Sequence, residues 1–193
     1  MKRLCVYCGS SPGADPSYLE AAKTVGRILV EREIELVYGG GNVGLMGALA
    51  DSVLAHSGKV TGVMPNFLVS KEVAHEGLTT MHVVATMHER KRLMAELSDA
   101  FVALPGGMGT LEELFEVLTW AQLGLHPKPC GLLNISGYFD HLIEFLRCTV
   151  QQRFVSQEHF AAVQVDTNLK RLLDRFERHA APQSNKWLDR DKR

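Results

Sequence analysis

Short apolar runs alternate along this chain with longer segments in which apolar residues recur every three or four positions. The runs have the length of strands and the longer segments have the period of helices, and short glycine-rich or proline-rich stretches separate them. This alternation is typical of βαβ units, in which a parallel sheet carries helices on both faces. The pattern therefore predicts an α/β fold with an open parallel sheet in a single domain.

Individual elements can be predicted from the same pattern. The predicted strands cover residues 4–8, 34–38, 59–64, 79–84, 100–104 and 130–134. The predicted helices cover residues 44–57, 87–97, 110–123, 138–152 and 168–179, and an earlier helix begins at Pro16 with Asp15 as its cap. We expect Gly58 to end the second helix in a left-handed conformation, Pro65 to stop the third strand, and residues 66–77 to form a loop with one short helix.

The composition fits one core. Of the 193 residues, 46% are hydrophobic, which is ample apolar material for a domain of this size. We assign residues 1–180 to this domain. Residues 181–193 are expected to form a polar C-terminal tail, which Trp187 is placed to pin down.

Charge and hydropathy exclude two classes of partner. The 21 Lys and Arg residues balance 22 Asp and Glu residues to a net charge of −1, so no global positive field attracts nucleic acid or an anionic membrane. The apolar runs fall far short of the roughly 20 residues that span a bilayer, and residues 4–7 are too few for a signal-peptide core. We therefore expect a soluble, cytoplasmic protein that holds an anionic ligand by local geometry.

The four cysteines are too few and too scattered for a disulfide scaffold. Cys5 and Cys8 form a C-x-x-C pair, but they fall in a predicted strand, where side chains three positions apart point to opposite faces. Cys130 and Cys148 provide no second close pair, and the eight His residues show no H-E-x-x-H spacing. Buried, reduced thiols are therefore favoured over a zinc site.

Glycine-rich turns follow three of the predicted strands. They are Gly9-Ser10-Ser11-Pro12-Gly13, Gly39-Gly40-Gly41-Asn42-Val43-Gly44 and Pro105-Gly106-Gly107-Met108-Gly109-Thr110. Loops that follow parallel strands gather at one edge of the sheet, where open α/β folds bind their ligands. Glycine lets the backbone approach a ligand, and the start of the next helix offers unpaired N–H groups to a phosphate. Three such turns together favour a phosphate site over the alternative that each only makes a tight turn.

Two common phosphate-binding motifs do not fit these turns. The spacing from Gly39 to Gly44 is similar to the G-x-G-x-x-G fingerprint of dinucleotide-binding proteins, but it follows the second strand instead of the first. The acidic residue expected at the end of the next strand is replaced by Met64 and Pro65. No turn contains G-K-[ST], so a triphosphate site with magnesium is also unsupported.

Arg90 lies in the first turn of the helix predicted over residues 87–97, on the face that carries Leu93, Met94 and Leu97. A guanidinium on the buried face of a helix needs an accepting partner. That partner is either structural, such as Glu96 or Asp99, or a phosphate or ribose hydroxyl bound beside the glycine turns. The neighbouring Lys91 is more simply explained as a solvated charge.

Glu113 also has two explanations. The run from Thr110 to Glu113 fits the capping box [ST]-x-x-[EQ], in which the glutamate bonds back to the backbone N–H of the threonine. The same carboxylate also lies at the helix start that the Gly106–Gly109 turn leaves open. There it could stabilise positive charge at the anomeric carbon of a sugar or activate a water.

The run from Pro105 to Glu113 reads P-G-G-x-G-T-x-x-E, and Arg90-Lys91 lies on the preceding helix. This combination resembles the hallmark of the "lonely guy" family, the cytokinin riboside 5′-monophosphate phosphoribohydrolases. The likeness extends from Cys8-Gly9-Ser10 through Tyr38-Gly39-Gly40-Gly41 and Gly44-Leu45-Met46-Gly47 to Thr119-Trp120-Ala121-Gln122-Leu123-Gly124, and so covers most of residues 4 to 150.

The resemblance implies a homodimeric, Rossmann-like enzyme without a metal or organic cofactor. Such an enzyme would hydrolyse the N-glycosidic bond of AMP-type nucleotides and release the free base and ribose 5-phosphate. By this match Arg90 and Glu113 are the catalytic pair. The implied substrate contacts are Glu72, Arg90, Lys91, Gly107, Met108, Gly109, Thr110, Leu111, Glu112, Glu113 and Thr119. The glycine turns add Gly9, Ser10, Gly40, Gly41 and Gly106 to the expected substrate-binding residues.

Three other functions fit the sequence less well. A nucleotide-binding or carrier protein of the same fold would keep the glycine turns and Arg90 but would not need Glu113. A nicotinamide-dependent oxidoreductase lacks its fingerprint position and its ribose-binding acid. Family members have also carried the label "lysine decarboxylase", but the sequence marks no recognisable lysine site for pyridoxal phosphate.

Overall fold

The computed structural model describes residues 1–69 and 74–179, and within these residues seven strands form one parallel sheet. The spatial order is β4-β3-β2-β1-β5-β6-β7. The strands are β1 (Arg3–Tyr7), β2 (Glu35–Tyr38), β3 (Val60–Pro65), β4 (Thr80–Val84), β5 (Ala100–Ala103), β6 (Cys130–Leu133) and β7 (Val163–Asp166). The predicted open α/β architecture is thus confirmed.

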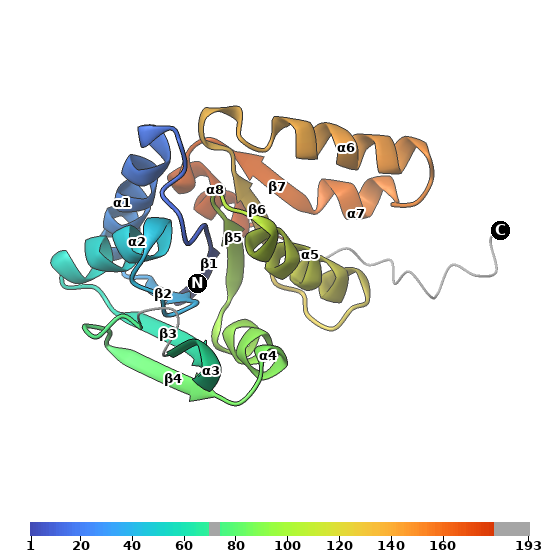
Figure 1. Ribbon diagram of the computed structural model, residues 1–193. Helices are drawn as coiled ribbons and strands as arrows, with labels where there is room; N and C mark the ends of the chain where they lie inside the picture. The colour runs from blue at the N-terminus through green and yellow to red at the C-terminus, as the bar shows by residue number, and fades with distance from the viewer. Residues whose placement is uncertain (70–73, 180–193) are drawn as a thin grey trace.

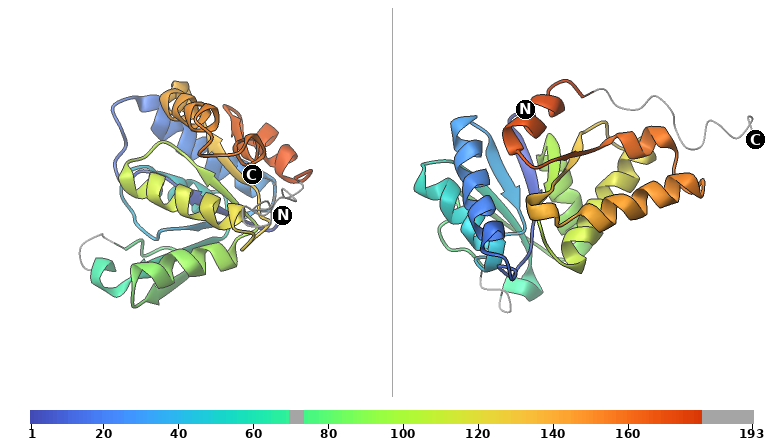
Figure 2. Two further views of the ribbon diagram at one scale, coloured as in Figure 1. Left: turned by 90° about the vertical axis from the view of Figure 1, so that its right-hand side faces the viewer. Right: turned by 90° about the horizontal axis from the view of Figure 1, so that it is seen from above.

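Helices cover both faces of the sheet (Figures 1 and 2). One face packs against α1 (Pro16–Glu31), α2 (Gly44–Ala55) and α8 (Leu169–Phe176). The other face packs against α4 (Met87–Leu97) and α5 (Met108–Gln122), with the first turns of α6 (Asp140–Gln151) beside them. The remaining helical segments are the short α3 (Asn66–Val69), η1 (Ile135–Gly137) and α7 (Gln157–Ala161). Two separate apolar cores result, one on each side of the sheet.

Local sequence sets most of these boundaries. Asp15 caps α1 by accepting a hydrogen bond from the Ser17 N–H at 2.8 Å, and Pro16 occupies the first turn, where its missing N–H costs nothing. The apolar stripe of α1 places Ala22, Val25 and Leu29 in the core.

The end of α2 differs from the prediction. Ser57, and not Gly58, takes the left-handed conformation, with φ of 62°. A Cβ at position 58 would lie 2.5 Å from Val30 Cγ2 and 2.6 Å from Val53 Cγ1, so glycine is needed there to let α1 and α2 pack closely. The glycine was correctly linked to the helix end, but for the wrong physical reason.

Three other boundaries also differ. Pro65 is the last residue of β3, paired in register with Val84 of the edge strand β4, so the strand includes the proline and ends at it. α7 and β7 were not predicted, since α7 is short and the two valines of β7 alternate with Gln164 and Asp166 and so form no apolar run. The predicted tail with Trp187 lies outside the described residues.

Cys5 and Cys8 lie on opposite sides of the sheet, one in each apolar core, as the strand geometry requires. Burial raises the pKa of both thiols, which keeps them protonated. No helix among the described residues is long and apolar enough to cross a membrane.

Candidate active site

The three glycine turns meet at one edge of the sheet, as predicted. β1 is central, with β2 on one side and β5 on the other, so the chain reverses its direction of travel across the sheet at β1. The turn after β1 is bonded to both neighbours: the Gly9 N–H donates to the Pro105 carbonyl and the Gly9 carbonyl accepts from the Leu45 N–H, each at 3.0 Å. Such a switch point at the carboxyl ends of the strands is where open α/β folds bind ligands.

The turn after β2 owes its glycines to close packing. A Cβ on Gly39 would lie 2.0 Å from Nη2 of Arg90, and one on Gly44 would lie 2.3 Å from the Ser10 backbone. Gly40 and Gly41 are buried, and Gly40 has φ of 85°. Their expected role in substrate binding stays a prediction, and so does that of Gly9, whose backbone groups are already bonded to the other turns. The neighbouring Ser10 is exposed.

The turn after β5 leads into an open helix start. α5 begins at Met108 with Gly107 as its N-cap, and no side chain caps it. Gly107, Met108 and Gly109 are exposed, and nothing lies within 4 Å of where a Cβ of Gly107 or Gly109 would be. Since the first amides of a helix have no partner within it, this end offers free donors and a positive dipole to an anion.

The predicted capping box does not form. Thr110 is buried inside the first turn of α5, because the helix starts earlier than the threonine. Thr110 packs instead against Gly106, where a Cβ would lie 2.1 Å from its Oγ1 atom. Capping therefore does not account for Glu113.

Arg90 is buried, with 8% of its surface exposed, as its place on the helix face predicted. Its Nε donates to the Val63 carbonyl at 3.1 Å and its Nη2 donates to the Gly39 carbonyl at 3.3 Å. The structural partners considered from sequence are not used: Glu96 pairs with Arg92, and Asp99 accepts from the backbone of Lys2 and Arg3. The guanidinium is thus fixed by one carbonyl within β3 and one that directly follows β2.

Glu113 lies in the second turn of α5 and faces this guanidinium, with its Oε1 atom 3.9 Å from Nη2 of Arg90. Its side chain is 13% exposed. Burial raises the pKa of Glu113 to about 7, although the positive charge of Arg90 acts in the opposite direction. A carboxyl that changes its protonation state near neutral pH is suited to exchange a proton with a reacting group.

Lys91 was expected from the sequence to be a solvated charge. That prediction is wrong, because Lys91 is buried against α5. Its ammonium contacts Glu112 and lies 3.0 Å from Oε1 of Glu116. Burial lowers the pKa of Lys91, but the bonds to these two carboxylates outweigh burial and raise the pKa overall. Glu116 was missed by the sequence analysis; its position one helical turn after Glu113 was the available signal.

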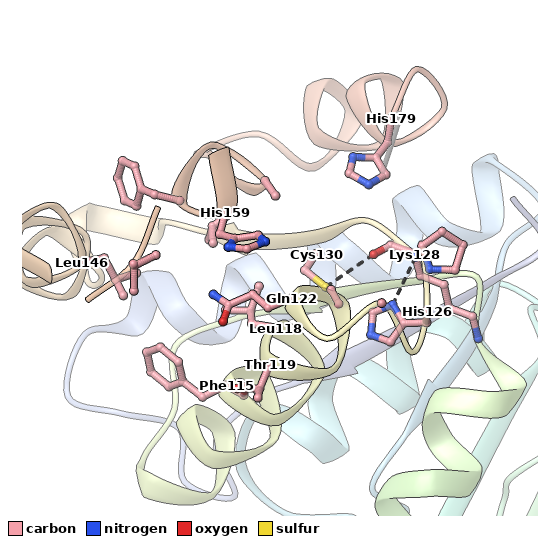
Figure 3. A pocket seen from close by; sticks show the side chains of 17 residues that line it. Phe115, Leu118, Thr119, Gln122, His126, Lys128, Cys130, Leu146, His159 and His179 are labelled. Atoms are coloured by element: carbon pink, nitrogen blue, oxygen red, sulfur yellow. Dashed lines mark hydrogen bonds between the residues drawn. The ribbon is translucent and has the colours of Figure 1, made fainter. Parts of the chain in front are cut away.

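Thr119 lies apart from the other predicted site residues. It is exposed, its hydroxyl donates to the Phe115 carbonyl at 2.7 Å, and it lines a separate pocket of about 420 Å³ (Figure 3). This mainly apolar pocket lies between α5, α6 and α7, away from the glycine turns. Leu111 is half-buried on the first turns of α5. Glu72, the remaining predicted contact, lies outside the described residues.

The arrangement combines an anion-binding helix start with an acid on the same helix, Glu113, which is paired with a buried cation, Arg90 of α4. It suits a ligand whose phosphate binds at Gly107–Gly109 and whose reacting atom reaches Glu113.

Comparison with known proteins identifies close relatives. Residues 46–176 match the sequence model of a family described as "Possible lysine decarboxylase". The chain is 50% identical over 179 residues to cytokinin riboside 5′-monophosphate phosphoribohydrolase LOG7 of Arabidopsis thaliana, covering 92% of this chain and 82% of that protein. It is 48% identical over 189 residues to LOG1 of the same plant, covering 96% and 89%.

Solved structures show the same fold at lower identity. The structure of TM1055 matches with a TM-score of 0.72 and 18% identity, covering 92% of this chain and 99% of that one. The molybdenum cofactor binding protein from Rippkaea orientalis matches with a TM-score of 0.68 and 20% identity, covering 92% and 97%. These likenesses establish the architecture alone.

Proposed function

The chain belongs to the family of the cytokinin riboside 5′-monophosphate phosphoribohydrolases, and from this membership we propose that it hydrolyses the N-glycosidic bond of nucleoside 5′-monophosphates. The substrates are AMP and cytokinin riboside 5′-monophosphates, and the products are the free base and ribose 5-phosphate. The observation that carries the proposal is the buried Glu113 carboxyl, held 3.9 Å from Arg90 on the helix with the uncapped start.

The start of α5 binds the substrate phosphate in this proposal. The amides of the first turn have no helical partner, and the exposed glycines let a phosphate approach them. The phosphate then serves as a handle, whose binding energy holds the sugar at Glu113. Met108 and Gly109 act through their backbone, and Arg90 orients the phosphate or the sugar.

Glu113 acts on the anomeric carbon. When the bond from C1′ to the base nitrogen breaks, its electron pair goes to the base and positive charge develops on the ribose ring. The Glu113 carboxylate offsets that charge and takes a proton from the attacking water, whose oxygen bonds to C1′. Overall, the base gains the proton that the water loses. Because the carboxylate is the active form, turnover is expected to rise with pH through about 7.

Two observations favour this function over the alternatives. A carrier would not need a carboxyl whose burial raises its pKa to about 7, and the relatives of about 50% identity bear the names of hydrolases. A decarboxylase with pyridoxal phosphate needs a free lysine, whereas Lys91 is bound by Glu112 and Glu116.

The direct test is product analysis. The pure protein is incubated at pH 8 with AMP, isopentenyl-AMP, GMP and CMP, and the bases released are separated by chromatography. We expect free base and an equal amount of ribose 5-phosphate from at least the adenine nucleotides. Binding without release of any base would support the carrier instead.

We also propose that the enzyme is a homodimer. α6 is poorly covered within the described chain, and Phe145 on it is 63% exposed, while the following Phe154 is 80% exposed. Their sequence neighbours Leu146 and Val155 line the apolar pocket of α5 and α7. Exposed apolar surface of this kind is typical of a subunit interface. A second copy would also explain Thr119, which could reach a substrate held by the partner.

A further inference from the structure

We propose that Tyr138 is a positioning residue for the substrate phosphate, which it serves by fixing the peptide that opens α5. The Tyr138 hydroxyl donates a hydrogen bond of 2.6 Å to the Gly106 carbonyl. The inference rests on the proposed function, because it takes a phosphate monoester as the ligand of that helix start. It adds to the site a residue that the sequence motif does not contain.

A strained turn delivers Tyr138 to this position. After β6 the chain passes through Ser136 and Gly137, both in the left-handed region with φ of 50° and 73°. For a serine such a backbone conformation costs free energy, and such costs persist where the surroundings enforce them.

The surroundings are two side chains of the same turn. Asn134 is buried, accepts a hydrogen bond from the Phe139 N–H and donates to Asp140 Oδ1, each at 2.7 Å. A Cβ on Gly137 would lie 2.6 Å from Oδ2 of Asp140, so only glycine fits the turn. Ser136 is held in addition by a hydroxyl contact of 2.9 Å with Ser17. The turn is therefore built to aim one aromatic side chain.

The Tyr138 side chain has one polar group, its hydroxyl, and this hydroxyl bonds to the glycine turn after β5. The Tyr138 ring packs edge-on against Tyr18 at 5.5 Å and against Phe139 at 4.9 Å. A phenylalanine would make the same ring contacts, so packing alone does not require the hydroxyl. What the hydroxyl adds is the bond to Gly106.

Gly106 is held from the other side as well. A Cβ there would lie 2.1 Å from Thr110 Oγ1 and 2.8 Å from the Gly9 nitrogen, so this residue is wedged against α5 and the first turn. Its carbonyl belongs to the same planar peptide as the Gly107 N–H, which points the opposite way. Fixing the carbonyl therefore fixes the direction of the N–H at the N-cap of α5. The bond adds a restraint at the carbonyl itself, where the glycines on both sides of the peptide oppose rotation less than other residues would.

The test measures ligand binding and not turnover. Isothermal calorimetry gives the Kd of ribose 5-phosphate and of adenosine for the wild type, for Tyr138→Phe and for the control Tyr18→Phe, with thermal melting of each. We expect Tyr138→Phe to bind ribose 5-phosphate about tenfold more weakly, the loss that one hydrogen bond supports. Its affinity for adenosine, which has no phosphate, should stay within twofold, and Tyr18→Phe should match the wild type for both ligands.

Three binding results would overturn the inference. They are an unchanged affinity of Tyr138→Phe for ribose 5-phosphate, an equal loss for both ligands, and a wild type that binds no ribose 5-phosphate. Failure of the proposed function looks different, because a wild type that binds ribose 5-phosphate but leaves AMP intact contradicts hydrolysis and still tests Tyr138. A Tyr138→Phe variant that also melts well below Tyr18→Phe would show a structural role and overturn the inference as well.

Discussion

The Glu113 carboxyl is buried beside Arg90, whose hydrogen-bond donors are partly used elsewhere. Two of the Arg90 donors go to the carbonyls of Val63 and Gly39, and the carboxyl stays 3.9 Å away without a close hydrogen bond to the guanidinium. Arg90 therefore supplies charge and a fixed position without neutralising Glu113 completely. This is the balance that leaves the pKa of the acid at about 7.

Glu113→Gln should stabilise the protein above neutral pH. The pKa of Glu113 rises from 4.5 in the unfolded chain to about 7 in the folded one, so the folded state binds more protons between these values. The free energy of unfolding contributed by this group therefore falls as pH rises through that window, by roughly 3 kcal/mol in total. Glutamine does not titrate, so the variant should melt several degrees above the wild type at pH 8 and close to it at pH 5.

Differential scanning fluorimetry across pH 5 to 8 measures this difference. Glu96→Gln on the exposed surface of α4 is the matched control. The difference between its melting temperature and that of the wild type should be the same at pH 5 and pH 8. If Glu113→Gln instead melted below the wild type at pH 8, the carboxylate would be a stabilising partner of Arg90, and its destabilisation by burial would be contradicted.

At the scale of single residues, the side chains of the site were easier to predict from the sequence than the groups to which they bond. A buried arginine on a helix face needs a hydrogen-bond acceptor, and Arg90 was identified as a candidate site residue for that reason. Its acceptors were not predictable, because the carbonyls of Gly39 and Val63 belong to other strands and their positions depend on the whole sheet. Lys91 was misjudged for the same reason, since its carboxylate partners lie on α5.

Helix ends decide how the site is built at the scale of elements. α5 starts at Met108 and so leaves its first amides open, whereas a start at Thr110 would have used Glu113 as a cap. Hydrophobic periodicity locates a helix but not its first turn, because Met108 and Gly109 are exposed and lie off the buried face that gives the helix its period. The motif could therefore be located in the sequence, while the role of Glu113 remained open.

The end of α2 gives a paired prediction on stability. Ser57→Gly should raise the melting temperature slightly, because glycine adopts φ of 62° without the steric cost that serine bears. Gly58→Ala should lower it by several degrees, because the new Cβ would meet Val30 and Val53 at about 2.5 Å. Thermal melting of both variants checks the assignment. The opposite order, with Gly58→Ala tolerated and Ser57→Gly neutral or harmful, would contradict the packing described here.

The sheet order creates the site at the scale of the molecule. The chain fills one side of β1 with β2, β3 and β4 and then crosses to the other side with β5, β6 and β7. Parallel strands were predictable from the alternating pattern, and with them the common edge for the glycine turns. The edge strand β7 was not predictable, because its two valines alternate with polar residues and form no apolar run.

The proposed homodimer makes a prediction at α6. Phe145→Asp places a charge in the exposed apolar surface and should convert the dimer to a monomer, because burying that charge in an interface is costly. Arg147→Asp, on another face of the same helix, is the control and should leave the dimer intact. Light scattering coupled to size-exclusion chromatography gives the mass. A monomeric wild type would contradict the dimer, and an unchanged mass for Phe145→Asp would exclude this face.

The most direct test of the central claim follows the oxygen of the water. AMP is incubated at pH 8 in ¹⁸O-labelled water with the wild type and with Glu113→Gln, and products are identified by mass spectrometry. The account predicts adenine together with ribose 5-phosphate labelled at C1 from the wild type. It predicts a rate lower by about 10² to 10³ or more from the variant, which should still bind AMP. Adenine release by Glu113→Gln at the wild-type rate, or intact AMP with the wild type, would contradict it.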